Sequence, residues 1–102
     1  MKLSLDTTHS EHTRVALIHE GQTYEKTAPH SVLRAQNILP LLEVLLREHD
    51  VHLSDISEIT VAPGPGSYTG LRVGFAVGNM LALLLQIPLN GKIPPSFPLY
   101  SS

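Results

Sequence analysis

Hydrophobic and polar residues alternate along the first third of the chain. The alternation covers residues 2–6, 15–18 and 22–28, and the compact turn Glu20-Gly21-Gln22 joins the last two segments. A period of two, interrupted by a tight glycine turn, is typical of half-buried strands connected as hairpins. The pattern therefore predicts three consecutive antiparallel strands, the third of which ends at Pro29.

Two later segments carry the period of a helix. Apolar residues recur every three or four positions from Val32 to His49 and again from Thr69 to Gln86, which predicts a helix in each. Pro40 lies inside the first segment and has no backbone donor. A kink or break is therefore predicted near Asn37.

A short apolar stretch follows each predicted helix, at residues 59–62 and 87–91. The resulting order is β-β-β-α-β-α-β. Because tight turns join antiparallel strands and helical crossovers join parallel ones, the order predicts an α/β fold with a mixed five-stranded sheet and two main helices. This is the ribonuclease-H-like arrangement that forms half of an actin-like (ASKHA) protein. The domain is predicted to cover residues 1–91, followed by a flexible tail, rich in proline and serine, over 92–102.

Composition narrows the function classes. The chain has 102 residues, a formal net charge of −2 and no cysteine. One domain of this size excludes two lobes around a cleft, and the lack of cysteine excludes disulfides, thiolate metal sites and a thiol nucleophile. No basic face is present to neutralise a nucleic acid backbone, so a role in RNA metabolism is expected to run through another protein. The lack of cysteine also suits the reducing cytoplasm, and residues 1–6 show no apolar run long enough for a signal peptide.

Two segments could hold an anion. Residues 64–74 read GPGSYTGLRVG, between a predicted strand and a predicted helix, where free backbone donors lie beside glycines. The segment is neither a Walker loop nor a GxGxxG fingerprint, and a tight strand-to-helix turn is the alternative that local chemistry favours. Asp6-Thr7 could likewise hold magnesium and phosphate, although an aspartate that hydrogen-bonds its own turn is the simpler interpretation. The candidate contacts for a nucleotide such as ATP with magnesium are Asp6, Thr7, Gly64, Gly66, Ser67 and Thr69.

Other reactive groups lack the spacing that catalysis needs. His9 and His12 have no third ligand at a diagnostic spacing, so no metal site is predicted. The serine of residues 66–70 is displaced from the G-x-S-x-G pattern of hydrolases. No catalytic residue is therefore predicted.

The second predicted helix is apolar on nearly all sides. Small residues recur every four positions, which gives it a smooth stripe, and each interior glycine costs about 0.5–1 kcal/mol relative to alanine unless close packing offsets it. A helix of this kind must be covered on more than one side, by the other helix, a partner chain or a bilayer. Its polar residues and its position between strands disfavour the membrane. We predict a helical interface with another chain, formed by Ile38, Leu42, Leu45, Gly70, Gly74, Val77, Gly78, Leu81 and Ala82.

Several of these segments resemble one family. Leu5-Asp6-Thr7-Thr8 resembles the opening of TsaB (YeaZ-type) proteins, and GPGSYTGLRVG is close to their GPGSFTGLRIG signature. Further similar segments are residues 38–42, 53–56 and 87–89. The resemblance covers residues 2–91, in the order and approximate spacing of the amino-terminal domain of the family.

The resemblance implies a function that the residues alone do not. It implies a cytoplasmic, non-catalytic subunit of the machinery that makes threonylcarbamoyladenosine (t6A) in tRNA. Such a subunit docks through its two helices to TsaD, which carries the transferase chemistry, works indirectly with the ATPase TsaE, reaches tRNA only through the complex and pairs with itself when the partner is absent. No cofactor of its own is implied.

The sequence departs from the family in its domain content, and two other functions compete with the one that the resemblance implies. Typical members have a second domain that this sequence does not contain, and nucleotide binding depends on the cleft between the two. A nucleotide-binding actin-like ATPase using Asp6, Thr7 and the glycine loop is the first alternative. A glycoprotease-type peptidase is the second, and the lack of a suitable nucleophile ranks it last.

Overall fold

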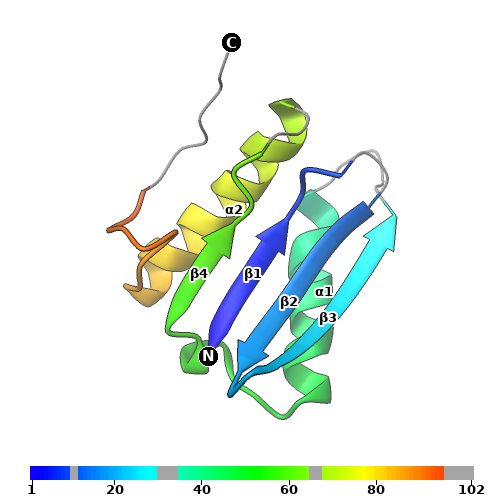
Figure 1. Cartoon of the computed structure of the whole chain (residues 1–102), viewed down its shortest axis with the longest axis vertical. Helices are drawn as coiled ribbons and strands as arrows, with labels where there is room; N and C mark the ends of the chain where they lie inside the picture. The colour runs from blue at the N-terminus through cyan, green and yellow to red at the C-terminus, as the bar shows by residue number, and fades with distance from the viewer. Residues whose placement is uncertain (10–11, 30–34, 65–67, 96–102) are drawn as a thin grey trace.

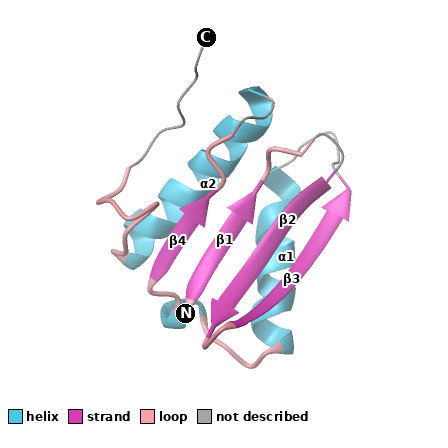
Figure 2. Ribbon diagram, viewed as in Figure 1, coloured by secondary structure: helices cyan, strands magenta, loops and turns pink. Residues whose placement is uncertain are grey.

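In the computed structural model, the described residues form a four-stranded sheet with two helices on one of its faces (Figure 1 and Figure 2). These residues are 1–9, 12–29, 35–64 and 68–95. The strands are β1 (Lys2–Asp6), β2 (His12–His19), β3 (Gln22–Pro29) and β4 (Glu58–Val61). The helices are α1 (Ala35–Glu48) and α2 (Tyr68–Leu85), and a short 3₁₀ helix, η1, covers Leu53–Asp55.

The strands lie in the order β3-β2-β1-β4, so β1 is central. It pairs antiparallel with β2 and parallel with β4, in a register that sets Leu3 opposite Leu17 on one side and Ile59 on the other. Glu20 and Gly21 both have positive φ, 50° and 77°, which is the geometry of a two-residue hairpin turn between twisted strands. The predicted mixed sheet and antiparallel meander are confirmed.

Pro40 does not divide α1. The predicted break near Asn37 is wrong, because a single helix runs from Ala35 to Glu48 with Pro40 inside it. Since the helix begins at Ala35, Pro40 lies only one turn in, and the bond from its missing N–H to the carbonyl of residue 36 is the single helical bond lost. The predicted start of this helix at Val32 lies outside the described residues.

The predicted fifth strand over 87–91 is also wrong. Leu89 forms one parallel bridge with Ile59 and then one antiparallel bridge with Lys92. Between these two, Asn90 and Gly91 have φ of 51° and 75°, so the chain reverses in a tight turn instead of running on beside β4. Lys92 is therefore part of this turn. Most of the predicted tail, residues 96–102, lies outside the described residues.

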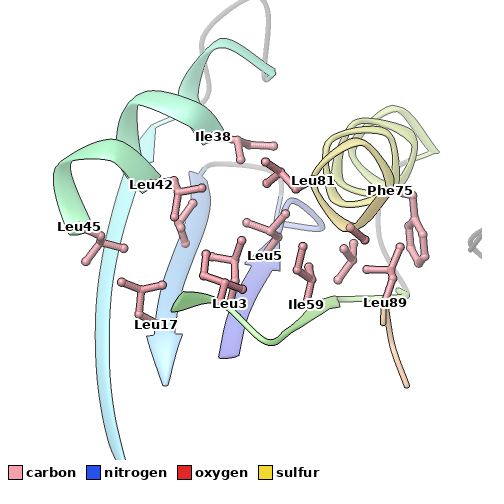
Figure 3. Close-up of a cluster of buried hydrophobic side chains, with 14 residues drawn as sticks. Leu3, Leu5, Leu17, Ile38, Leu42, Leu45, Ile59, Phe75, Leu81 and Leu89 are labelled. Carbon is pink, nitrogen blue, oxygen red and sulfur yellow. The ribbon is translucent and has the colours of Figure 1, made fainter. Parts of the chain in front are cut away.

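The core lies between the sheet and the two helices (Figure 3). Alternation along the strands aims one set of side chains at the helices, and α1 and α2 each contribute one buried stripe. The buried cluster contains Leu3, Leu5, Val15, Leu17, Ile38, Leu42, Leu45, Ile56, Ile59, Val61, Phe75, Leu81, Ala82 and Leu89. Truncating one of its leucines to alanine costs about 2–5 kcal/mol of stability. Among the described helices, none is long and apolar enough to cross a membrane.

Candidate functional site

The glycine stripe of α2 faces the sheet of its own chain. A β-carbon placed on Gly74 would lie 2.5 Å from Thr7 Oγ1, and one on Gly78 would lie 2.6 Å from Val61 Cγ2. Gly70 and Ala82 are buried on the same side. Only hydrogen atoms fit there, so the glycines allow α2 to lie close to β1 and β4.

This packing corrects the predicted partner interface. Ile38, Leu42 and Leu45 of α1 are at most 3% exposed, and so is Leu81 of α2. Together with Gly70, Gly74, Gly78 and Ala82 they form the contact between the helices and the sheet, so they are unavailable to another protein. The surplus apolar surface was predicted correctly, but a 3.6-residue period alone does not say which of two apolar stripes faces inward.

A second apolar stripe runs along α2 beside the buried one. Val73, Val77, Met80 and Leu84 are spaced by four, three and four residues, so they lie along one face of the helix. Met80 is 47% exposed and Leu84 is 70% exposed, while Val73 and Val77 are half-buried against the core. Val77 is the one residue of the predicted interface that belongs to this stripe.

Helix geometry places Leu39 on the side of α1 that faces α2. Lys26 on β3 forms an ion pair with Glu48 at 2.8 Å, so Glu48 marks the side of α1 that faces the sheet edge. Leu39 precedes Glu48 by nine residues, or two and a half turns at 100° per residue, so the two side chains lie on opposite sides of α1. Because Glu48 faces the sheet edge, Leu39 faces α2. Figure 3 shows Ile38 and Leu81 pointing toward one another between the helices.

Leu39 is 44% exposed. Val77 and Leu84 come four residues before and three after Leu81, so they lie on its side of α2. We call Leu39, Val73, Val77, Met80 and Leu84 the apolar seam.

The candidate anion site begins with Asp6, at the end of β1. Its Oδ1 accepts hydrogen bonds from the Thr8 N–H at 2.9 Å and the Thr8 hydroxyl at 2.6 Å. Its Oδ2 lies 3.3 Å from His9 Nε2. Burial alone raises the pKa of Asp6, but the two bonds from Thr8, with His9 and Arg14 nearby, outweigh it and lower the pKa below its usual 3.8. The carboxylate stabilises its own turn.

Thr7 points the opposite way from Asp6. It is 1% exposed, and its hydroxyl donates to the Gly70 carbonyl at 2.5 Å. Asp6 instead lines a hollow of about 500 Å³, mainly on the sheet face away from the helices, with Ser4, Arg14, Thr60, Val61, Ala62, Pro63 and Asn90. The structure therefore separates two residues that were predicted to act together.

The remaining candidate contacts lie in the loop before α2 and in its first turn. Gly64 has φ of 112°, a conformation open to glycine. Gly66 and Ser67 lie outside the described residues, as does the side chain of Thr69. The rings of His9 and His12 stack at 4.4 Å, and no group of three or more potential metal ligands occurs within the described part of the chain.

Comparison with known proteins places the chain in a family. A family model described as "TsaD: tRNA N6-adenosine threonylcarbamoyltransferase" matches residues 12–91. Since this match covers well over half of the sequence, the chain belongs to the TsaD family.

Individual relatives show which type of protein within this family the chain resembles. The "tRNA threonylcarbamoyladenosine biosynthesis protein TsaB" of Bacillus subtilis is 42% identical over 74 residues, which cover 72% of this chain and 30% of the relative. The solved structure "YeaZ from Pseudomonas aeruginosa" superposes with a TM-score of 0.79 and 40% identity, covering 86% of this chain and 41% of that one. The TsaB/YeaZ-type resemblance is confirmed.

Some of the relatives carry an enzyme name. A "tRNA N6-adenosine threonylcarbamoyltransferase" of Burkholderia ambifaria (strain MC40-6) is 34% identical over 85 residues, which cover 81% of this chain and 24% of the relative. The chain thus spans about a quarter to two fifths of the length of the proteins it matches.

Sequence reasoning missed the apolar seam and the role of Thr7. The four-three-four spacing of Val73, Val77, Met80 and Leu84 is present in the sequence. The interface was nevertheless assigned to the glycine stripe, because its spacing of four is more regular. The bond from Thr7 to Gly70 joins residues 63 positions apart, and no local pattern announces such a contact.

Proposed function

We propose that this chain is a non-catalytic subunit of the cytoplasmic machinery that makes t6A in tRNA, and that it docks to the TsaD subunit through the apolar seam. TsaE is then engaged only indirectly, and tRNA only through the complex. The observation that carries the proposal is the exposure of Met80 and Leu84 on a helix that is already packed on its own sheet. The name of the TsaB relative supports the same pathway, and the likeness to the YeaZ structure supports the same type of protein.

The chemistry of the seam suits a partner helix. Residues spaced by four and three along a helix form the row of knobs that a second helix receives between its own side chains. Fully burying a leucine or methionine side chain contributes about 1.5–3 kcal/mol. Burial of Leu39, Met80 and Leu84 against a partner would therefore offset part of the translational and rotational entropy that is lost on association.

The sheet suits the actin-like half-domain of this family. Its strand order and its two helices on one face fit that fold, with the turn at Asn90 in place of the fifth strand. A nucleotide-binding ATPase is the less favoured function, because Asp6 and Thr7 face opposite sides of the sheet and Thr7 is engaged by Gly70.

Light scattering of the chain mixed with a TsaD subunit tests the proposal. The wild-type chain is expected to form a heterodimer at micromolar concentration, and Leu84→Glu or Met80→Glu should weaken it at least tenfold. The matched control is Leu83→Glu. Leu83 is 53% exposed but lies about 100° around the helix from Leu84, so this variant should bind like wild type.

The first helix offers a second matched pair. Leu39→Glu should weaken the complex, whereas Val44→Glu should not, because Val44 lies four residues before Glu48 on the sheet-edge side of α1. Failure of the wild-type chain to bind, or equal loss in the seam and control variants, would contradict the proposal.

A further inference from the structure

The turn that follows Leu89 has the sequence Asn90-Gly91. Leu89 and Lys92 exchange hydrogen bonds at 2.9 and 3.1 Å across it, and Asn90 and Gly91 have φ of 51° and 75°. Positive φ at both central residues defines a two-residue type I′ turn, for which asparagine followed by glycine is the preferred pair. The same pair is prone to deamidation, because glycine has no side chain to shield its backbone nitrogen.

Deamidation would take place between two neighbouring groups of this turn. The Gly91 nitrogen loses its proton to a base and attacks Asn90 Cγ. The Cγ–Nδ2 bond then breaks, and the leaving nitrogen takes up a proton and departs as ammonia. Water opens the resulting succinimide ring at either of its carbonyl groups, which yields aspartate or isoaspartate. Water is the only reactant that the chain does not supply.

The attacking nitrogen is accessible in the folded chain. Gly91 is exposed, and a β-carbon on it would meet no atom within 4 Å. Its N–H donates no hydrogen bond to another residue within the described ranges. What restrains the reaction must therefore act on Asn90.

The Asn90 side chain is held by β4. The Val61 N–H donates to Asn90 Oδ1 at 2.8 Å, and Asn90 Nδ2 donates to the Val61 carbonyl at 3.2 Å. This pair of bonds fixes the rotation about the Cα–Cβ bond of Asn90, and the turn fixes the rotation about its Cα–C bond. Both of these rotatable bonds are part of the five-membered ring that deamidation must close.

The conformation of the turn does not suit ring closure. A nearly planar succinimide ring eclipses the Gly91 nitrogen with Asn90 Cβ, whereas the first central residue of a type I′ turn has ψ of about +30°, which keeps the two atoms far from eclipsed. Closure therefore requires Asn90 to leave Val61 and the turn to open.

We propose that Asn90 is a deamidation site that the folded turn restrains, and that its conversion loosens the contact between the turn and β4. Aspartate still accepts a bond from the Val61 N–H, but it has no donor for the Val61 carbonyl. Its carboxylate also adds a second negative charge to the hollow that Asp6 lines. Isoaspartate lengthens the main chain by one carbon between Leu89 and Lys92 and so disrupts the turn. This inference is independent of the proposed function.

Mass spectrometry after incubation at alkaline pH tests the site. The folded chain is compared with the chain unfolded in guanidinium chloride at the same pH. Deamidation at Asn90 is expected in both, at least tenfold faster in the unfolded chain. Asn37 and Asn79, which precede Ile38 and Met80, are internal controls. Because the side chains of their neighbours hinder the attack, they should react at least tenfold more slowly than Asn90 in the unfolded chain.

Gly91→Ala in guanidinium chloride tests the route of the reaction. The added methyl group hinders the backbone nitrogen, so deamidation at Asn90 should slow at least tenfold. Because neither chain is folded under these conditions, the strain of alanine at positive φ does not enter the comparison. An unmodified Asn90 in the unfolded wild type would overturn the site. Equal rates in the folded and unfolded wild type would overturn the restraint by the turn.

Asn90→Asp reproduces the aspartate product and tests the consequence. In urea unfolding at pH 7, the equilibrium constant for unfolding should rise at least threefold over wild type, because the Val61 carbonyl loses its donor. The difference should shrink in acid, where the protonated carboxyl group again has a donor. A variant as stable as wild type at pH 7, or a loss of stability that is the same in acid, would overturn the role assigned to that bond.

Discussion

The Thr7 hydroxyl donates a hydrogen bond to the carbonyl oxygen of Gly70, which ties the turn after β1 to the first turn of α2. Thr7 is buried, and its oxygen fills the space that any side chain on Gly74 would need. One hydroxyl therefore fixes both the position of the helix start and its distance from the sheet. The placement of the seam residues of α2 beside the buried stripe depends on this contact.

Removing the hydroxyl should loosen the start of α2. Thr7→Val keeps the shape and deletes the donor, so the free energy of unfolding should fall by about 0.5–1.5 kcal/mol. Amide exchange in residues 71–74 should increase, as measured by NMR. Thr7→Ser loses a methyl group but retains the donor, so those amides should stay protected; equal exchange in both variants would refute the contact.

Adding a methyl group to the glycine stripe should destabilise the fold. On an exposed helix surface, glycine to alanine stabilises by about 1 kcal/mol. Gly74→Ala and Gly78→Ala should instead lose about 1–3 kcal/mol by urea unfolding, because their β-carbons meet buried atoms of Thr7 and Val61. Ala76 is exposed, and Ala76→Gly should show the ordinary propensity loss of about 1 kcal/mol. A stabilising Gly74→Ala would mean that α2 does not lie against β1.

Asp6 should make the free energy of unfolding depend on pH in the acid range. Its pKa is lowered in the folded chain, so the folded state favours the charged form. The resulting stability is present above the pKa of the unfolded chain, about 3.9, and is lost as pH falls through the folded pKa. Asp6→Asn lacks this titration. In urea unfolding from pH 7 to pH 2.5, the free energy of unfolding of wild type should fall relative to that of Asp6→Asn only below about pH 4. A difference in unfolding free energy that is constant with pH would contradict the lowered pKa of Asp6.

Replacing Pro40 should stabilise α1. Pro40 lies inside the helix and is exposed, so Pro40→Ala restores one backbone donor without altering the core. A gain of about 1–3 kcal/mol in unfolding free energy is expected, reduced by the greater freedom of the unfolded chain. No gain would show that the helix starts later than Ala35.

The seam and the core illustrate what periodicity can and cannot predict. The alternation at Leu3 and Leu5 and the 3.6-residue period of both helices predicted the strands, the helices and the mixed sheet. On α2, however, the glycine stripe and the seam have nearly the same period. Which of them is buried depends on whether Gly74 fits against Thr7, a contact between distant parts of the chain.

The turn at Asn90 shows a different limit. Residues 87–91 include Ile87 and Leu89 and read as a strand by composition, and Leu89 does bridge to β4. The dipeptide Asn90-Gly91 is a turn signal. It ends the strand directly after Leu89, although the preceding residues have the apolar pattern of a strand. The sequence also grouped Asp6 with Thr7 in one candidate site, whereas alternation puts these two residues on opposite faces of the sheet.

The central position of β1 sets an order on folding. Its pairing with β2 closes a short hairpin, whereas its parallel pairing with β4 joins residues such as Lys2 and Glu58 across the whole of α1. Loop closure over that distance is slow compared with hairpin formation. We expect pulse-labelling hydrogen exchange during refolding to protect amides of β2 before those of β4. The half of the sheet that carries α2 and the seam would then be the last to assemble.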